Sequence, residues 1–333
     1  MMKLSLLDQA RIMSGKTAVE ALKNAEELAV VADELGYHRM WMAEHHGIDA
    51  VASSAPEVSI AYLAAKTKNI RLGTGGTMMM HYSPLKLAEV FKTLSAYAPG
   101  RIDFGVGRAP GGDGHSIYAL SEGREPNLDN MYEKLAYTLQ YINDEVPNDR
   151  LYNKTVAMPS QIVLPEAWLL GSSGNSAMQA GRMGIGYSFA QFFTGSMTED
   201  ILDLYRRSFT PTAFLEEPNI IVTYMVTVAE TKEEAEYEAL PGDISRLWLM
   251  KGNIRQALTP EEAQEYPLTE IDKMTIQQFR QRNLHIVGEA KEVASILQEE
   301  QFIYGFDEAM IMSVPYSQEK RLEGHRLLAK ELL

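Results

Sequence analysis

The strongest constraint on the fold is a repeated alternation of short apolar runs with helical patterns along the whole chain. Eight runs have the length and apolar content of buried strands, namely residues 3–8, 38–43, 69–75, 101–107, 167–170, 185–190, 219–229 and 308–314. Strands that alternate with helices form parallel sheets, and eight such units most simply close into a (β/α)8 TIM barrel. A doubly wound open sheet is the alternative α/β architecture.

Capping signals mark where several helices begin. Thr17 with Glu20, and Ser54 with Glu57, have the spacing of capping boxes, and Pro84 suits the first position of a helix. Further helices are expected over residues 127–143, 174–183, 198–208, 289–300 and 318–332.

The chain is longer than a minimal barrel. It has 333 residues, whereas about 250 are typical of this architecture, so the surplus is expected in insertions. The segments 109–126, 146–166 and 240–283 are the candidates, and the last is the largest. We expect one domain over residues 1–333, with 240–283 as a lid over the site.

Composition excludes several classes of function. The net charge is −14, from 45 acidic and 31 basic residues, which disfavours nucleic acid and anionic membranes as partners. The absence of cysteine excludes disulfides, zinc–thiolate sites and thiol nucleophiles, and fits a reducing compartment. No signal peptide or apolar stretch of about 18 residues is present. We therefore expect a cytoplasmic protein.

Four stretches with polar or glycine-rich residues lie at expected strand ends. They are "AEHH" (43–46), "GTGGT" (73–77), "GVGRAPGGDG" (105–114) and "LLGSSGNS" (169–176). In a parallel barrel, strands end at the same face, and active sites lie there. The four stretches are therefore expected to meet at one mouth.

The last two stretches have features that suit a phosphate. Hydroxyls and backbone amides at the start of the helix after Gly171 can hold an anion, although Ser172, Ser173 or Ser176 can equally serve as ordinary caps. Arg108 carries a guanidinium suited to phosphate, or is an ordinary surface arginine. The glycines of 105–114 do not match a dinucleotide-binding fingerprint, because Pro110 occupies its third glycine position.

His45 and His46 are adjacent, and this spacing bears on what they can do. On an extended backbone the two side chains point to opposite sides, and no second cluster with metal-ligand spacing follows, so a metal site is not expected. One histidine at the mouth can act as an acid–base group, with a pKa of about 6.5 when unperturbed. A solvated loop without a catalytic role is the alternative.

These four stretches, in this order, resemble the luciferase-like flavin monooxygenases. The resemblance is densest in "LGYHRMWMAEHH", "RLGTGGTMMMHYSPLKLAEVF" and "PGRIDFGVGRAPG", and it extends from residue 3 to the final helix. It implies a (β/α)8 barrel with reduced FMN at the mouth, where the flavin and dioxygen oxidise a small organic substrate. A separate NAD(P)H:flavin reductase is expected to supply the reduced flavin, and a homodimer is expected through residues 59–67 and 85–97.

The resemblance also assigns roles to individual residues. It places the catalytic histidine at His45, with Glu44 orienting it. The small-residue pair beside the flavin ring, often joined by a non-prolyl cis peptide, falls on Gly75 and Gly76, next to Thr74. The phosphate ligands fall on Arg108, Gly171, Ser172, Ser173 and Ser176.

The sequence departs from bacterial luciferase at two places. Gly107 stands where luciferase has a cysteine, and the aromatic lining is only partly visible, at Phe189 and Gln191. Light emission is therefore not implied, and the substrate stays open. Two alternatives are a deazaflavin (F420)-dependent oxidoreductase and a flavin-binding protein without turnover.

Overall fold

Eight parallel strands form a closed barrel in the computed structural model, which describes residues 2–109, 111–124 and 130–333. The strand order is β10-β1-β2-β3-β5-β6-β7-β8, and β8 pairs back to β10. The predicted TIM barrel is therefore confirmed. The barrel strands are β1 (Lys3–Asp8), β2 (Arg39–Met42), β3 (Arg71–Thr74), β5 (Ile102–Gly107), β6 (Glu166–Gly171), β7 (Gly186–Ala190), β8 (Ile220–Ala229) and β10 (Glu308–Met312). β4 (Thr77–Met78) pairs with β5, and β9 (Ile286–Glu289), which the apolar pattern did not reveal, pairs with β8.

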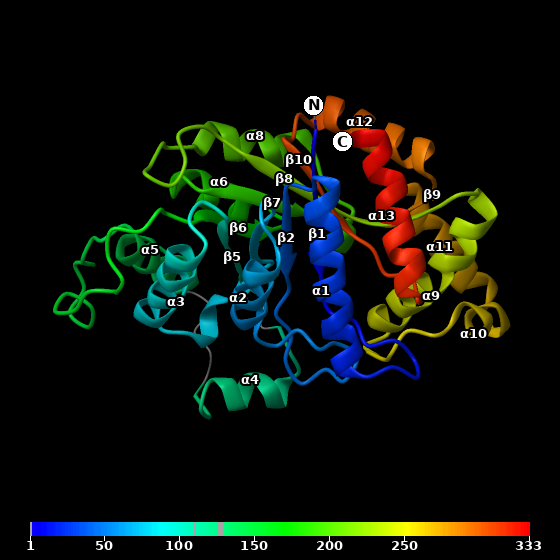
Figure 1. The fold of residues 1–333 in the computed structure, drawn as a ribbon, viewed down its shortest axis with the longest axis horizontal. Helices are drawn as coiled ribbons and strands as arrows, with labels where there is room; N and C mark the ends of the chain where they lie inside the picture. Colours follow the sequence, from blue (N-terminus) through cyan, green and yellow to red (C-terminus); the bar gives the residue numbers. More distant parts are fainter. Residues whose placement is uncertain (1, 110, 125–129) are drawn as a thin grey trace.

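Helices surround the barrel (Figure 1). The larger ones are α1 (Ala18–Leu35), α2 (Pro56–Lys66), α3 (Pro84–Tyr97), α5 (Met131–Ile142), α6 (Gly174–Arg182), α8 (Glu199–Ser208), α12 (Ala290–Tyr304) and α13 (Gln318–Leu332). Shorter pieces are the 3-10 turn η1 (Met79–His81), α4 (Gly114–Leu120) and α7 (Gln191–Thr194). Of the helix expected over 127–143, residues 127–129 lie outside the described residues. No helix within the described ranges is both long and apolar enough to cross a membrane.

The two predicted capping boxes have different outcomes. Thr17 caps α1 in a complete box with Glu20. The Ser54 box is wrong, because α2 begins at Pro56 and its N-cap, Ala55, makes no side-chain hydrogen bond. Proline has no N–H to be capped and its φ is already helical, so Pro56 sets the helix start without a capping side chain.

A buried ion cluster fills the amino-terminal end of the barrel interior. The Arg39 side chain, which is fully buried, donates to Glu308 at 2.8 Å, to Asp103 at 2.8 Å and to Glu166 at 2.9 Å. Trp168 packs over its guanidinium, whose carbon lies 4.8 Å from the ring centroid. This end holds the strand N-termini, where barrel residues serve stability rather than chemistry.

The insertion between β8 and β10 is more regular than its sequence pattern indicated. It consists of α9 (Lys232–Met250), α10 (Pro260–Glu265), α11 (Glu270–Gln281) and β9, so it begins before the expected residue 240. Ser14 in the loop after β1 donates its amide to Ala257 at 3.0 Å. Arg246 donates to the carbonyls of Phe192 and Phe193, beside β7. The insertion therefore contacts loops from two well-separated strands of the barrel.

Candidate active site

All the predicted site residues follow the carboxyl ends of barrel strands. Both chain termini lie at the top of Figure 1, and the loops that follow the strands lie at the bottom, near α4 and α10. The registers pair Asp8 with Met42 and Met42 with Thr74, so the first three strands end at one level. The four stretches predicted to meet at the mouth therefore follow strand ends on the same face of the barrel.

His45 is partly buried in the loop after β2. Its amide donates to the Ser53 carbonyl at 2.9 Å, while its side-chain Nδ1 is buried without a hydrogen-bond partner among the described residues. Burial, with electrostatic interactions from Arg11 and His46, lowers the pKa of His45 to about 4. The imidazole is therefore neutral near pH 7, which corrects the expectation of an ordinary histidine that titrates at this pH.

Glu44 orients the second histidine and not the first. Its carboxylate, which is fully buried, lies 2.7 Å from His46 Nε2 and accepts hydrogen bonds from the Met78 amide at 2.8 Å and the Tyr82 hydroxyl at 2.6 Å. His46 also donates its amide to Gly111 at 2.7 Å. The predicted contact of Glu44 with His45 is therefore wrong. Glu44 and His46 hold together the loops after β2, β3 and β5.

Gly75 and Gly76 are joined by a cis peptide bond. A Cβ on Gly76 would lie 2.9 Å from the Gly107 amide nitrogen, and one on Gly75 would lie 2.6 Å from Leu7 Cδ1. Gly76 therefore requires glycine because the backbone of β5 lies against it, whereas a side chain on Gly75 would have to displace the side chains of Leu7 and Trp41. Thr74 is fully buried, and its hydroxyl donates to the Gly105 carbonyl at 2.8 Å, so any contact with a cofactor would come from its backbone.

Arg108 lies beside the glycine–serine turn. The register pairs Val106 with Leu169 on the neighbouring strand, which places Arg108 level with Gly171. The Arg108 side chain is exposed, and no described residue forms a hydrogen bond or ion pair with it. Next to it, a Cβ on Gly107 would meet only Met78 Cε, at 3.8 Å, so the space above this strand end is open.

Ser173 and Ser176 form the capping box of α6. The Ser176 hydroxyl donates to the Ser173 carbonyl at 2.8 Å, and Ser173 accepts from the Ser176 amide. Both hydroxyls therefore act as ordinary caps here. The Ser172 hydroxyl has no partner within the described part of the chain, and the amides of Gly174 and Asn175 have none inside the helix. These groups are available to an anion.

Apolar side chains cover the barrel interior beneath the mouth. This inner apolar cluster consists of Leu7, Trp41, Ala43, Trp168, Ile221, Met225, Met310, Met312 and Val314. Phe189 is not part of it, because this side chain points outward into the core between barrel and helices. Its predicted place in an aromatic lining is therefore wrong, and methionine and tryptophan provide the lining instead.

Arg11, in the loop after β1, is a mouth residue that the sequence analysis missed. Its backbone forms an isolated bridge with Val51, beyond the histidine pair, and its charge lowers the pKa of His45. The sequence feature that could have identified Arg11 is its position three residues after the end of a strand. Among the described residues, no group of three or more His, Cys, Asp or Glu is arranged to hold a metal ion.

The barrel defines a (β/α)8 protein whose glycine-rich and polar loops follow the carboxyl ends of the strands. The family model of the luciferase-like monooxygenases matches residues 2–303. The N-acetyl-S-alkylcysteine monooxygenase of Bacillus subtilis is 37% identical over 337 residues, covering 100% of this chain and 99% of that one. The chain therefore belongs to the luciferase-like monooxygenase family.

Solved structures agree with this assignment. The crystal structure of apo-MsnO8 has a TM-score of 0.90 at 34% identity, covering 99% of this chain and 98% of that chain. Two more distant structures show the shared fold. The oxygenating constituent of 3,6-diketocamphane monooxygenase from a Pseudomonas putida plasmid, in complex with FMN, has a TM-score of 0.72 at 19% identity, covering 99% and 97% of the two chains. An F420-dependent secondary alcohol dehydrogenase has a TM-score of 0.69 at 15% identity, covering 100% and 99%.

Proposed function

We propose that this protein is an FMN-dependent monooxygenase that uses reduced flavin and dioxygen to oxidise a small organic substrate. The proposal is carried by the register of the strands, which places Arg108 level with Gly171, and by the lack of any described partner for the Arg108 side chain and the Ser172 hydroxyl. A guanidinium and a helix N-terminus together suit a phosphate. A Cβ on Gly107 would meet only Met78 Cε, so the flavin ring is proposed to lie above this strand end, beside the anion site.

The chain's own groups prepare the site for the flavin and the substrate. Reduced flavin supplies the electrons that activate dioxygen. The imidazole of His45 is neutral near pH 7, because its pKa is about 4 when no ligand is bound, so it is proposed to act as a weak base at one ring nitrogen. Glu44 keeps the surrounding loops in place through His46, Met78 and Tyr82.

The insertion is proposed to exclude water from the mouth. Its contacts with Ser14 on one side and Phe192 on the other place it between loops of the barrel's carboxyl end. Exclusion of water limits unproductive loss of oxidising equivalents before the substrate reacts. This supports the lid role that was expected of residues 240–283.

Two partners complete the proposal. No pyridine-nucleotide fingerprint was found in the sequence, so a separate NAD(P)H:flavin reductase is proposed to supply reduced FMN.

A homodimer through α2 and α3 is supported by exposed apolar side chains there: Val58 is 65% exposed, Tyr62 49% and Tyr97 85%. Sedimentation velocity tests the dimer.

The phosphate site is tested by titrating FMN and riboflavin into the wild-type protein and into Arg108→Ala. The loss of one charge-assisted contact should reduce the ratio of FMN affinity to riboflavin affinity by about ten-fold or more. Arg124→Ala, which removes an exposed arginine paired with Glu122, is the matched control. Equal affinity of the wild-type protein for the two flavins would remove the phosphate assignment.

The role of His45 is tested with His45→Ala and free reduced FMN. We expect FMN binding to be retained while oxygen consumption is uncoupled from product formation. Coupled turnover at the wild-type level would contradict an acid–base role. In the same assay, a protein that only carries flavin shows no substrate-dependent oxygen consumption.

The deazaflavin alternative is supported by the fold likeness to an F420-dependent dehydrogenase, at 15% identity. A parallel titration with FMN and with F420 separates the two cofactors. Tighter binding of F420 would favour hydride transfer without dioxygen.

A further inference from the structure

Arg11 has no counter-charge among the residues that the structure describes. No described residue forms a hydrogen bond or ion pair with its side chain, although the side chain is partly buried. Burial without a carboxylate nearby lowers the pKa of its guanidinium. An unpaired cation in a partly buried position is costly, because water is removed from the charge and no protein group replaces it.

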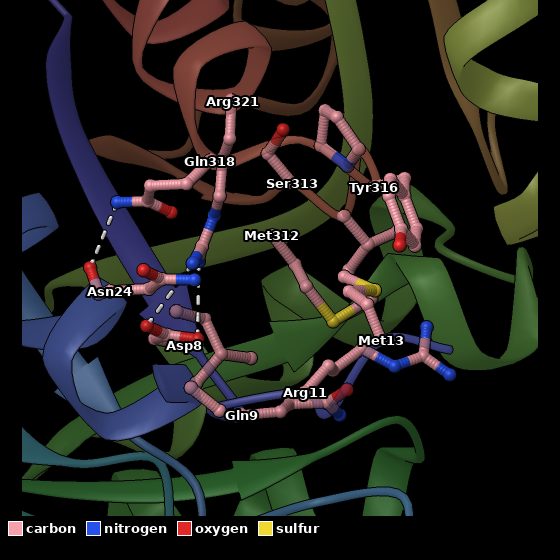
Figure 2. A pocket seen from close by; sticks show the side chains of 14 residues that line it. Asp8, Gln9, Arg11, Met13, Asn24, Met312, Ser313, Tyr316, Gln318 and Arg321 are labelled. Atoms are coloured by element: carbon pink, nitrogen blue, oxygen red, sulfur yellow. Dashed lines mark hydrogen bonds and ion pairs between the residues drawn. The ribbon is translucent and has the colours of Figure 1, made fainter. Parts of the chain in front are cut away.

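The cavity that Arg11 lines has an excess of positive charge. Its charged side chains are Asp8, Arg11 and Arg321. The Asp8 carboxylate forms an ion pair with Arg321 at 3.1 Å and accepts a hydrogen bond from the Ala10 amide at 2.8 Å. Figure 2 shows this pair joined by dashed lines and the Arg11 side chain extending away from it. One positive charge is therefore left for a ligand.

The cavity connects this charge to the inner apolar cluster. Leu7, Met312 and Val314 belong to that cluster and also line the cavity. They are its members nearest to solvent, at 5%, 6% and 6% exposure, whereas Trp41 is fully buried. The free volume of about 20 Å³ holds one or two water molecules, which is the size of a carboxylate group rather than a ring.

Arg11 lies on the opposite side of the barrel from the proposed phosphate site. Arg11 follows β1, whereas Arg108 and Ser172 follow β5 and β6, and in the barrel order β6 is four strands from β1 in either direction. A terminal phosphate held by Arg108 therefore cannot also satisfy Arg11. His45 follows β2, between these two sites, and the charge of Arg11 acts on its imidazole.

Resting on the proposed monooxygenase function, we propose that Arg11 binds the carboxylate of the substrate, and that the substrate is an amphipathic organic acid. Its carboxylate enters the cavity beside Arg11, and its apolar part, for which the cavity has no room, stays at the opening of the mouth, where Leu7, Met312 and Val314 are the members of the inner apolar cluster nearest to solvent. The flexible methionine side chains adapt to apolar groups of different shape. Arg11 is thus a residue that selects the substrate by charge.

The test measures binding of matched acids and amides by isothermal titration calorimetry. The probes are octanoate with octanamide, and N-acetylmethionine with N-acetylmethionine amide, titrated into the full chain with and without FMN. We expect the wild-type protein to bind at least one acid about ten-fold more tightly than its amide, because a charge-assisted hydrogen bond is lost in the amide. Arg11→Met should abolish this difference, and Arg11→Lys should keep part of it.

Lys16→Met is the matched control. It removes a positive charge from the same loop, but Lys16 is paired with Glu20, so the preference for acids should be unchanged. The proposal is overturned if the wild-type protein shows no preference, or if the preference persists in Arg11→Met with its thermal stability intact. It is also overturned if Arg11→Met weakens FMN binding and leaves the preference for acids unchanged.

These outcomes are separable from failure of the proposed function. Selective binding of acids by a protein that consumes no oxygen with reduced FMN would remove the monooxygenase and keep the role of Arg11. Oxygen consumption without selectivity for acids would keep the monooxygenase function and remove the proposed role of Arg11.

Discussion

His46 Nε2 lies 2.7 Å from the buried carboxylate of Glu44, while Nδ1 of the adjacent His45 has no partner in the described part of the chain. The two neighbouring histidines therefore have separate tasks. His46 ties the mouth loops to Glu44, and His45 is left free near Arg11. The backbone alternation that points successive side chains to opposite sides accounts for this division.

Glu44→Ala should destabilise the protein by about 3 kcal/mol, because the Met78 amide and the Tyr82 hydroxyl lose their buried acceptor. Urea unfolding monitored by circular dichroism measures this loss. Glu217→Ala removes an exposed carboxylate that no described residue contacts, and it should leave the midpoint unchanged. Equal urea midpoints for the two variants would contradict a stabilising role for the hydrogen bonds to Glu44.

The pKa of His45 should be about 4 in the ligand-free protein and should rise in Arg11→Met. Removing a nearby positive charge favours the protonated imidazole, so the direction is upward. Titration of the histidine ring signals by NMR measures both values, and Lys16→Met should not change them. A wild-type pKa near 6.5 would mean that the ring is solvated.

His325 should make the protein less stable in acid. Burial and the charge of Arg321 lower its pKa to about 3. The unfolded chain therefore binds a proton as pH falls below about 6.5 while the native state does not, so stability is lost progressively from there towards about pH 3.

The matching variant is His325→Phe, which cannot titrate. The drop in its urea midpoint between about pH 7 and about pH 5 should be smaller than that of the wild-type protein, with a remainder from His38, His45 and His285, whose pKa values burial also lowers. An identical drop in both proteins would mean that His325 is not buried in the neutral form.

Gly76→Ala and Gly107→Ala should behave differently although both replace a glycine at the mouth. The Cβ of the first would lie 2.9 Å from backbone atoms, so we expect a loss of about 1–3 kcal/mol in urea unfolding. The second has room for a Cβ and should keep its stability. If the flavin ring occupies that space, Gly107→Ala should instead weaken FMN binding in a fluorescence titration.

Several local elements were predictable because short-range patterns determine them. The eight barrel strands follow from runs of apolar residues, and the start of α1 follows from the spacing of Thr17 and Glu20. The Ser54 box failed because Pro56 starts α2 without a side-chain cap. β9 was missed because it follows the weakly patterned insertion directly and has only two apolar residues, Ile286 and Val287.

The sequence by itself determined the barrel, the family and which loops reach the mouth, because strand periodicity and the order of motifs are properties of the chain. Only the tertiary structure decided that Glu44 contacts His46, that Phe189 faces outward and that no carboxylate of the described residues pairs with Arg11. These are matters of side-chain direction and of contacts between distant strands, which depend on how the barrel closes.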